Sequence, residues 1–145
     1  MPEFEEVMPL PYGYGCTEGV SNWISVTPYS PSVSVCPNSE YNTSLSFTVT
    51  CQASSCPANT FYYCLATTQG ICNPHTGIPS VSCINSNDPN ISGSIPALGA
   101  GQSTTITIKL PPSALSSGTQ ITYYLVFYSS YAYAPLNIPI SVSVN

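Results

Sequence analysis

Apolar and polar residues alternate along most of the chain after residue 20, and this alternation limits what the chain can fold into. Successive side chains of a β-strand point to opposite faces, so a strand with one buried face repeats every second residue. The clearest case is Leu45-Ser-Phe47-Thr-Val49-Thr-Cys51, which places its apolar side chains on one face. No segment shows the period of about 3.6 residues that an amphipathic helix needs. The pattern therefore predicts an all-β fold.

Other alternating segments are separated by clusters of Pro, Gly, Asn and Ser, which favour turns. These segments are 24–26, 33–35, 61–67, 105–110, 121–128 and 138–144, with at most one short strand near Val81. We expect a β-sandwich of seven or eight strands over residues 21–145. Its predicted core contains Leu45, Phe47, Val49, Ile106, Ile108, Leu125 and Val142.

Residues 1–20 form an extended N-terminal arm in this interpretation, because their prolines and glycines suit neither a helix nor a paired strand. The arm carries the apolar residues Phe4, Val7, Leu10, Tyr12 and Tyr14. It is either a loose tail or a segment that packs along a neighbouring copy.

Segment 121–128 is apolar or aromatic on both faces, which is unusual for a strand in a two-layer sandwich. One face belongs to the core. The other, with Tyr124, Val126 and Tyr128, is covered by the chain's own arm or long loops, or it is an interface for a partner.

Charged residues make up only 5% of the chain, against about 25% in an ordinary soluble domain. Four of the six acidic residues lie in the first eighteen positions, and Lys109 is the single basic residue apart from His75. Binding to nucleic acid or to anionic lipid needs Lys or Arg, so both are excluded as partners. The numbered chain shows neither a secretory leader nor an apolar stretch long enough to span a membrane.

Seven cysteines predict disulfides, which persist in oxidising compartments and also inside hyperthermophiles. We expect an extracellular, cell-surface or virion location. The candidates for bridges are Cys36, Cys51, Cys56, Cys64, Cys72 and Cys83, with Cys72–Cys83 as the preferred pair. Cys16, on the arm, is then the odd cysteine, either a thiol or a bridge to another chain. A zinc site is the alternative, but no Cys-x2-Cys pair occurs, so we expect no metal.

Catalytic chemistry has few candidate residues: beyond residue 20 the acid–base groups are Glu40, His75 and Asp88. No Gly-x-Ser-x-Gly motif occurs, so we expect neither an enzyme nor a cofactor. Asn42 and Asn90 begin Asn-x-Ser/Thr sequons and are candidates for N-glycosylation. The bond between Asp88 and Pro89 is chemically labile in acid.

The segment from Ile95 to Gly101 is followed by a Thr-rich strand to Ile108, then by Pro111-Pro112 and strand 121–128. This arrangement resembles the middle of immunoglobulin-like domains in archaeal extracellular proteins. The body, residues 20–145, is similar to the Tyr/Ser/Thr-rich, charge-poor subunits of extracellular filaments and virion surface proteins of hyperthermophilic archaea.

This resemblance implies an immunoglobulin-like sandwich that serves as a structural subunit and assembles with copies of itself, as a homo-oligomer or filament. Other coat or surface proteins are further candidate partners. Many such subunits lend a strand to the next subunit, and residues 22–35 are the better candidate for one. The alternative function is an adhesion or carbohydrate-binding module in which tyrosines and Trp23 stack on sugars.

Overall fold

The structure is a computed structural model that describes residues 16, 18–36, 43–73, 75–111 and 116–145. Within this part of the chain all regular structure is β, apart from one short 3-10 turn, η1 (Val20–Asn22). The predicted all-β class is confirmed. The predicted arm residues Phe4, Val7, Leu10, Tyr12 and Tyr14, and the sequon residue Asn42, lie outside the described residues.

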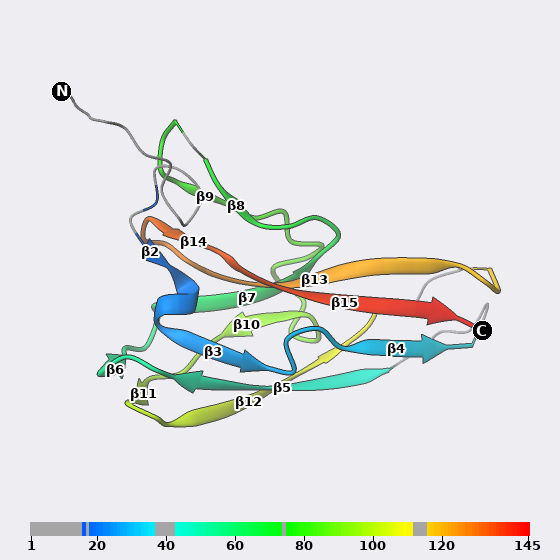
Figure 1. Cartoon of the computed structure of the whole chain (residues 1–145), viewed down its shortest axis with the longest axis horizontal. Helices are drawn as coiled ribbons and strands as arrows, with labels where there is room; N and C mark the ends of the chain where they lie inside the picture. Colours follow the sequence, from blue (N-terminus) through cyan, green and yellow to red (C-terminus); the bar gives the residue numbers. More distant parts are fainter. Residues whose placement is uncertain (1–15, 17, 37–42, 74, 112–115) are drawn as a thin grey trace.

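Two main sheets pack face to face (Figure 1). The smaller one is antiparallel, with the order β12 (Ser103–Lys109), β5 (Ser44–Cys51), β3 (Ile24–Thr27). The larger has the order β10 (Ser92–Ser94), β7 (Phe61–Ala66), β13 (Gln120–Ser129), β15 (Leu136–Val144), β4 (Ser32–Val35). Strand β4 runs parallel to β15, and the other neighbours in this sheet are antiparallel.

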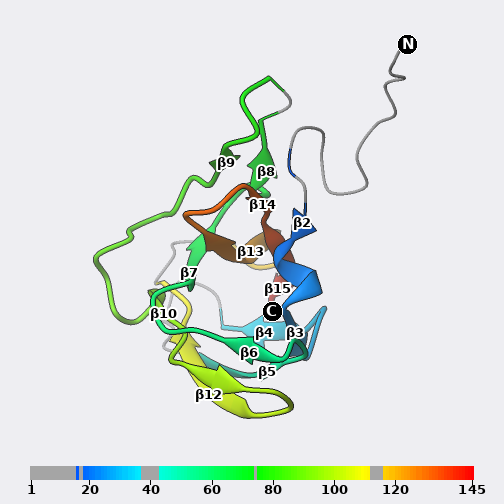
Figure 2. The same cartoon turned by 90° about the vertical axis from the view of Figure 1, so that its left-hand side faces the viewer.

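Three short pairs of strands complete the described fold. They are β11 (Leu98–Gly99) with β6 (Ser55–Cys56), β14 (Tyr133–Ala134) with β2 (Glu18–Gly19), and β8 (Ile71–Cys72) with β9 (Pro79–Ser80). The β2–β14 and β8–β9 pairs lie together at one end of the sandwich (Figures 1 and 2).

The segment predicted to be lent to a neighbour, residues 22–35, pairs within its own chain. Strand β3 pairs with β5 in the smaller sheet, and β4 pairs with β15 in the larger one. The break at Pro28–Pro31 is where the chain crosses from one sheet to the other.

The core lies between the two main sheets, where the inward residues of each strand meet. Six of the seven predicted core residues are buried, namely Phe47, Val49, Ile106, Ile108, Leu125 and Val142. Leu45, near the start of β5, is partly buried and packs against the same cluster. The period-two pattern thus assigned the inner faces correctly, because each paired strand keeps its alternation in register.

Hydroxyl groups line the outer face of the smaller sheet. Its outward residues in the register of β3, β5 and β12 are Ser25, Thr27, Ser44, Ser46, Thr48, Thr50, Ser103, Thr105 and Thr107, with Lys109 at the end. Ser46 bonds Thr107 across the strands at 3.0 Å, and Thr50 bonds Ser103 at 2.6 Å. This face needs no cover, since its side chains satisfy one another or water.

Candidate functional site

Three disulfides connect cysteines of the described chain: Cys16–Cys72, Cys51–Cys56 and Cys64–Cys83. Their Cα–Cα distances are 6.2, 6.0 and 5.6 Å, inside the usual range for disulfides. The prediction of disulfides is confirmed, but the preferred pair Cys72–Cys83 is wrong. Cys64 is the partner of Cys83 because residues 66 and 83 form a β-bridge that carries Cys83 alongside β7.

Cys16 is also not the odd cysteine, since it lies beside the β8–β9 hairpin and is joined to Cys72. The cysteine outside the three bridges is Cys36, an exposed residue directly after the edge strand β4. Sequence position alone misassigned both residues, because spacing along the chain carries no information on which loops meet in space.

The folded body begins before residue 20, where the arm was expected to end. Glu18 and Gly19 pair with Tyr133 and Ala134, and Val20 is fully buried in the core. Together with the Cys16–Cys72 bridge, these contacts fix the chain from Cys16 onward. The body therefore includes Cys16 and residues 18–20.

The outer face of β13 is largely covered by the chain itself. Tyr124 and Tyr128 are half-buried, and Val126 has an exposure of 0%. A Cβ built on Gly70 would lie 2.7 Å from Val126 Cγ1 and 3.2 Å from Val81 Cγ2, so the loop packs directly on the strand. The prediction that Val126 belongs to an interface is wrong, since the loop after β7 occupies that place.

Several bonds hold this covering loop in position. The Gly70 N–H donates to Asn137 Oδ1 at 2.8 Å, and Asn137 Nδ2 donates to the Gly70 carbonyl at 2.9 Å. The Cys64–Cys83 disulfide fixes the other end, beside a bond from the Ile84 N–H to the Leu65 carbonyl at 2.9 Å. We call residues 67–84 the covering loop.

Three of the five large apolar side chains that are exposed among the described residues lie instead at the end of the sandwich that carries the β8–β9 hairpin. Ile71 and Ile78, on the β8–β9 hairpin, are 57% and 62% exposed, and Tyr131, in the turn before β14, is 57% exposed. Strand β8 contacts β14, so the hairpin and the turn are neighbours (Figure 1). We call Ile71, Ile78 and Tyr131 the end surface. Large apolar side chains gathered in this way often mark an interaction site.

A row of aromatic rings supports the end surface from within. Phe61 lies 6.1 Å from Trp23, Trp23 lies 5.8 Å from Tyr133, and Tyr133 lies 5.8 Å from Tyr131, measured between ring centroids. Burial, then the nearby Glu18 carboxylate and Tyr131, raise the pKa of Tyr133 above its ordinary value.

Trp23 itself is half-buried within this row, and its Nε1 is buried without a hydrogen-bond partner. Its ring contacts Phe61 and Tyr133 in tilted arrangements. Trp23 is thus a packing residue within this row of rings.

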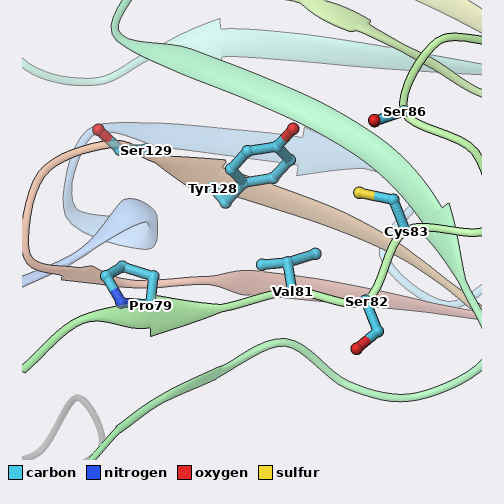
Figure 3. A pocket seen from close by; sticks show the side chains of 7 residues that line it. All are labelled: Pro79, Val81, Ser82, Cys83, Ser86, Tyr128 and Ser129. Atoms are coloured by element: carbon cyan, nitrogen blue, oxygen red, sulfur yellow. The ribbon is translucent and has the colours of Figure 1, made fainter.

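A pocket of about 490 Å³ lies between the covering loop and the end of β13 (Figure 3). Its lining is uncharged and consists of Pro79, Val81, Ser82, Cys83, Ser86, Tyr128 and Ser129. Tyr128 stacks against Tyr62 with ring centroids 5.8 Å apart, and burial and then Tyr62 raise its pKa. The pocket offers an aromatic ring and several hydroxyls but no acid–base pair.

The sequon residue Asn90 is exposed in the turn between the covering loop and β10. Its neighbour Ser92, the third residue of the sequon, is buried at 8% exposure, and its hydroxyl donates to the Asp88 carbonyl at 2.6 Å. Glycosylation of Asn90 and Asn42 stays a prediction.

No group of three or more His, Cys, Asp or Glu side chains among the described residues is placed to hold a metal ion. In the same part of the chain, no helix has the length and hydropathy needed to cross a membrane. No protein-family profile matches this chain, and no curated protein is significantly similar to it. The fold and the bridges therefore define the protein's class on their own: a disulfide-rich, all-β sandwich.

Proposed function

We propose that this protein is a repeating structural subunit of an extracellular filament or of a virion surface, of the kind made by hyperthermophilic archaea and their viruses. In this role it binds copies of itself and performs no catalysis. The observation that carries the proposal is the end surface: Ile71, Ile78 and Tyr131 expose apolar area at the end of the sandwich where Cys16 is bonded to Cys72.

The arm is the complementary partner in this proposal. It carries the apolar residues Phe4, Val7, Leu10, Tyr12 and Tyr14, which need a surface to cover. If the arm of one copy lies on the end surface of the next, the contact is head-to-tail, and such a contact gives a ring or an open filament.

The low charge of the body supports close packing between copies. Only 5% of the residues are charged, so two bodies approach with little electrostatic repulsion and little cost of burying ionised groups. Three disulfides support an oxidising, extracellular location.

We propose in addition that the sandwich is immunoglobulin-like. The support is the strand order. Strands β3 and β4 follow each other in the chain but belong to different sheets, and the last strand, β15, lies between β4 and β13. Backbone contacts between Val33 and Val142, which are register partners here, would be seen by nuclear magnetic resonance if this arrangement holds.

Sedimentation velocity over a range of protein concentrations tests the assembly. We expect large species for the complete chain, and monomers both for a chain lacking residues 1–15 and for Ile78→Asn. The matched control is Ile84→Asn, which changes an isoleucine that is 43% exposed but lies outside the end surface. The proposal fails if the complete chain stays monomeric, or if Ile84→Asn abolishes assembly as fully as Ile78→Asn does.

A second candidate function, a carbohydrate-binding module, is favoured by the pocket at Tyr128. A volume of about 490 Å³ suits a small ligand, and a neutral sugar could stack on the ring and bond to the serine hydroxyls. Calorimetric titration with neutral oligosaccharides tests this candidate. Binding that Tyr128→Ala removes would support it, whereas titrations without heat at millimolar sugar would rule it out.

A further inference from the structure

The acid-labile bond between Asp88 and Pro89 lies in a well-defined turn. The Ile91 N–H donates to the Asp88 carbonyl oxygen at 3.1 Å, which closes a β-turn with Asp first and Pro second, a favoured sequence for such turns. The Asp88 carboxylate accepts a bond from the Asn90 N–H at 2.9 Å, as Asp commonly does at the start of a turn. The side chain is thereby held close to its own backbone.

A second donor reaches the same carbonyl oxygen. Ser92 is buried, and its Oγ lies 2.6 Å from the Asp88 oxygen and 3.1 Å from the Ser86 oxygen. A hydroxyl has one proton to donate, so the shorter contact takes it. The carbonyl of the labile bond therefore receives two hydrogen bonds, from the Ile91 N–H and the Ser92 hydroxyl, and such donors stabilise the negative charge that develops when a carbonyl is attacked.

We propose that this turn is a self-cleavage site, at which acid triggers a single cut between Asp88 and Pro89. An oxygen of the protonated Asp88 carboxyl bonds to the Asp88 carbonyl carbon, and the bond from that carbon to the Pro89 nitrogen breaks. The carboxyl proton goes to the Pro89 nitrogen, which leaves as an amine. Water then opens the five-membered anhydride, so that Asp88 becomes a C-terminus with two carboxyl groups and one water has been consumed.

Strands β12 and β10 flank the turn. Lys109, on β12, donates its backbone N–H to the Asn90 carbonyl at 2.9 Å. Strand β10 continues from the turn and pairs with Tyr62 and Tyr63 on β7. The proposed cut uses the Asp88 carboxyl, so replacing that carboxyl should abolish it.

The cut would divide the chain but not the fold. All seven cysteines precede residue 84, so no disulfide within the chain can join residues 1–88 to residues 89–145. Pairing of β5 with β12, of β7 with β13, and of β4 with β15 crosses the cut and would hold the fragments together. The product is a two-fragment sandwich that separates only on unfolding.

The experiment is to incubate the purified chain about one pH unit below the ordinary Asp pKa of about 3.9, in native buffer and in denaturant, and to follow the intact mass. We expect fragments 1–88 and 89–145, which run separately on a denaturing gel without reductant but elute together under native conditions. The folded chain should be cut at least about tenfold faster than the unfolded chain, which is a modest effect for positioned carbonyl donors.

Variants identify the groups responsible. Asp88→Asn should not be cut, and Ser92→Ala should be cut about tenfold more slowly while Ser92→Thr, which keeps the hydroxyl, restores the rate. Ser94→Ala is the matched control, because it removes an exposed hydroxyl from the same strand, and it should be cut normally. Equal rates for folded and unfolded chains would overturn the proposal. So would a normal rate in Ser92→Ala with native circular dichroism.

Discussion

The two outer faces of the sandwich are built in opposite ways. On the smaller sheet, every outward position of β3, β5 and β12 carries a Ser or Thr hydroxyl except Lys109, and the face is bare. On the larger sheet, the outward residues of β7 and β13 include Tyr62, Val126 and Tyr128, and the covering loop packs on Val126.

The position of the disulfides follows this difference. Cys64–Cys83 and Cys16–Cys72 both involve the covering loop: the first ties the loop to β7 of the larger sheet, and the second ties it to Cys16. Only Cys51–Cys56, between β5 and β6, serves the other side. A loop with little regular structure of its own needs covalent support to stay on an apolar face, whereas a hydroxyl-lined face needs none.

The largest expected effect comes from removing a bridge on the covered side. Cys16→Ser with Cys72→Ser opens a loop of 56 residues and should lower the free energy of unfolding by about 4 kcal/mol. The same change at Cys51 and Cys56 opens a loop of 5 residues and should cost about 2 kcal/mol. Denaturant unfolding measures both. If removing Cys51–Cys56 lowered the free energy of unfolding more than removing Cys16–Cys72, the proposed role of Cys16–Cys72 in holding the covering loop would be contradicted.

Val126→Ala tests whether the covered face is truly a second small core. Val126 is fully buried and its Cγ1 packs under Gly70, so the cavity left behind should cost about 2 kcal/mol. Thr107→Ala, at an exposed position on the bare face, should change the stability by less than about 0.5 kcal/mol. If the two variants lose equal stability, the two faces do not differ as described.

Gly70→Ala adds a methyl group where the loop already touches the strand. The new Cβ would lie 2.7 Å from Val126 Cγ1, so the loop must shift, at a cost of about 1–2 kcal/mol. In the double variant with Val126→Ala the clash is relieved, and the combined loss should be smaller than the sum of the two single losses. If the stability losses of the two single variants simply add in the double variant, the loop does not pack on Val126.

The smallest effect concerns alkaline pH and buried tyrosines. Burial raises the pKa of Tyr63 above its ordinary value of 10.0. The unfolded chain therefore loses this proton first, so the stabilisation is complete below pH 10 and is lost as the pH rises through the folded-state pKa. Tyr63→Phe should flatten the decline in stability above pH 10. The free energy of unfolding is measured with denaturant at several pH values. If it falls above pH 10 as steeply in Tyr63→Phe as in the original chain, other groups cause the fall.

The sequence predicted the inner faces better than the outer ones. Alternation within β5, β12 and β13 is local, so Phe47, Ile106 and Leu125 could be assigned to the core from their own neighbours. Whether Val126 is covered depends on a loop that returns to the sheet, and the sequence signals for this are only Gly70 and the two cysteines that close the loop. Contacts made across such distances along the chain cannot be read from a short window.

The same limit explains the errors at the candidate site. The prolines of residues 1–20 predict an arm that carries Cys16, yet its partner Cys72 lies on a hairpin 56 residues away. Ile71, Ile78 and Tyr131 were not singled out, because exposure depends on which turns share an end of the sandwich. For Ile78, the sequence offers one sign of exposure. This isoleucine lies between turn residues and outside any segment of alternating apolar and polar residues.

Electron microscopy of the concentrated, oxidised chain tests the central claim, self-assembly through the arm and the end surface, most directly. The account predicts rings or filaments in which repeating bodies meet at the end that carries the β8–β9 hairpin, and their loss when residues 1–15 are removed. A field of separate 15.4 kDa particles at every concentration, or a regular assembly joined through the hydroxyl-lined face of the smaller sheet, would contradict it.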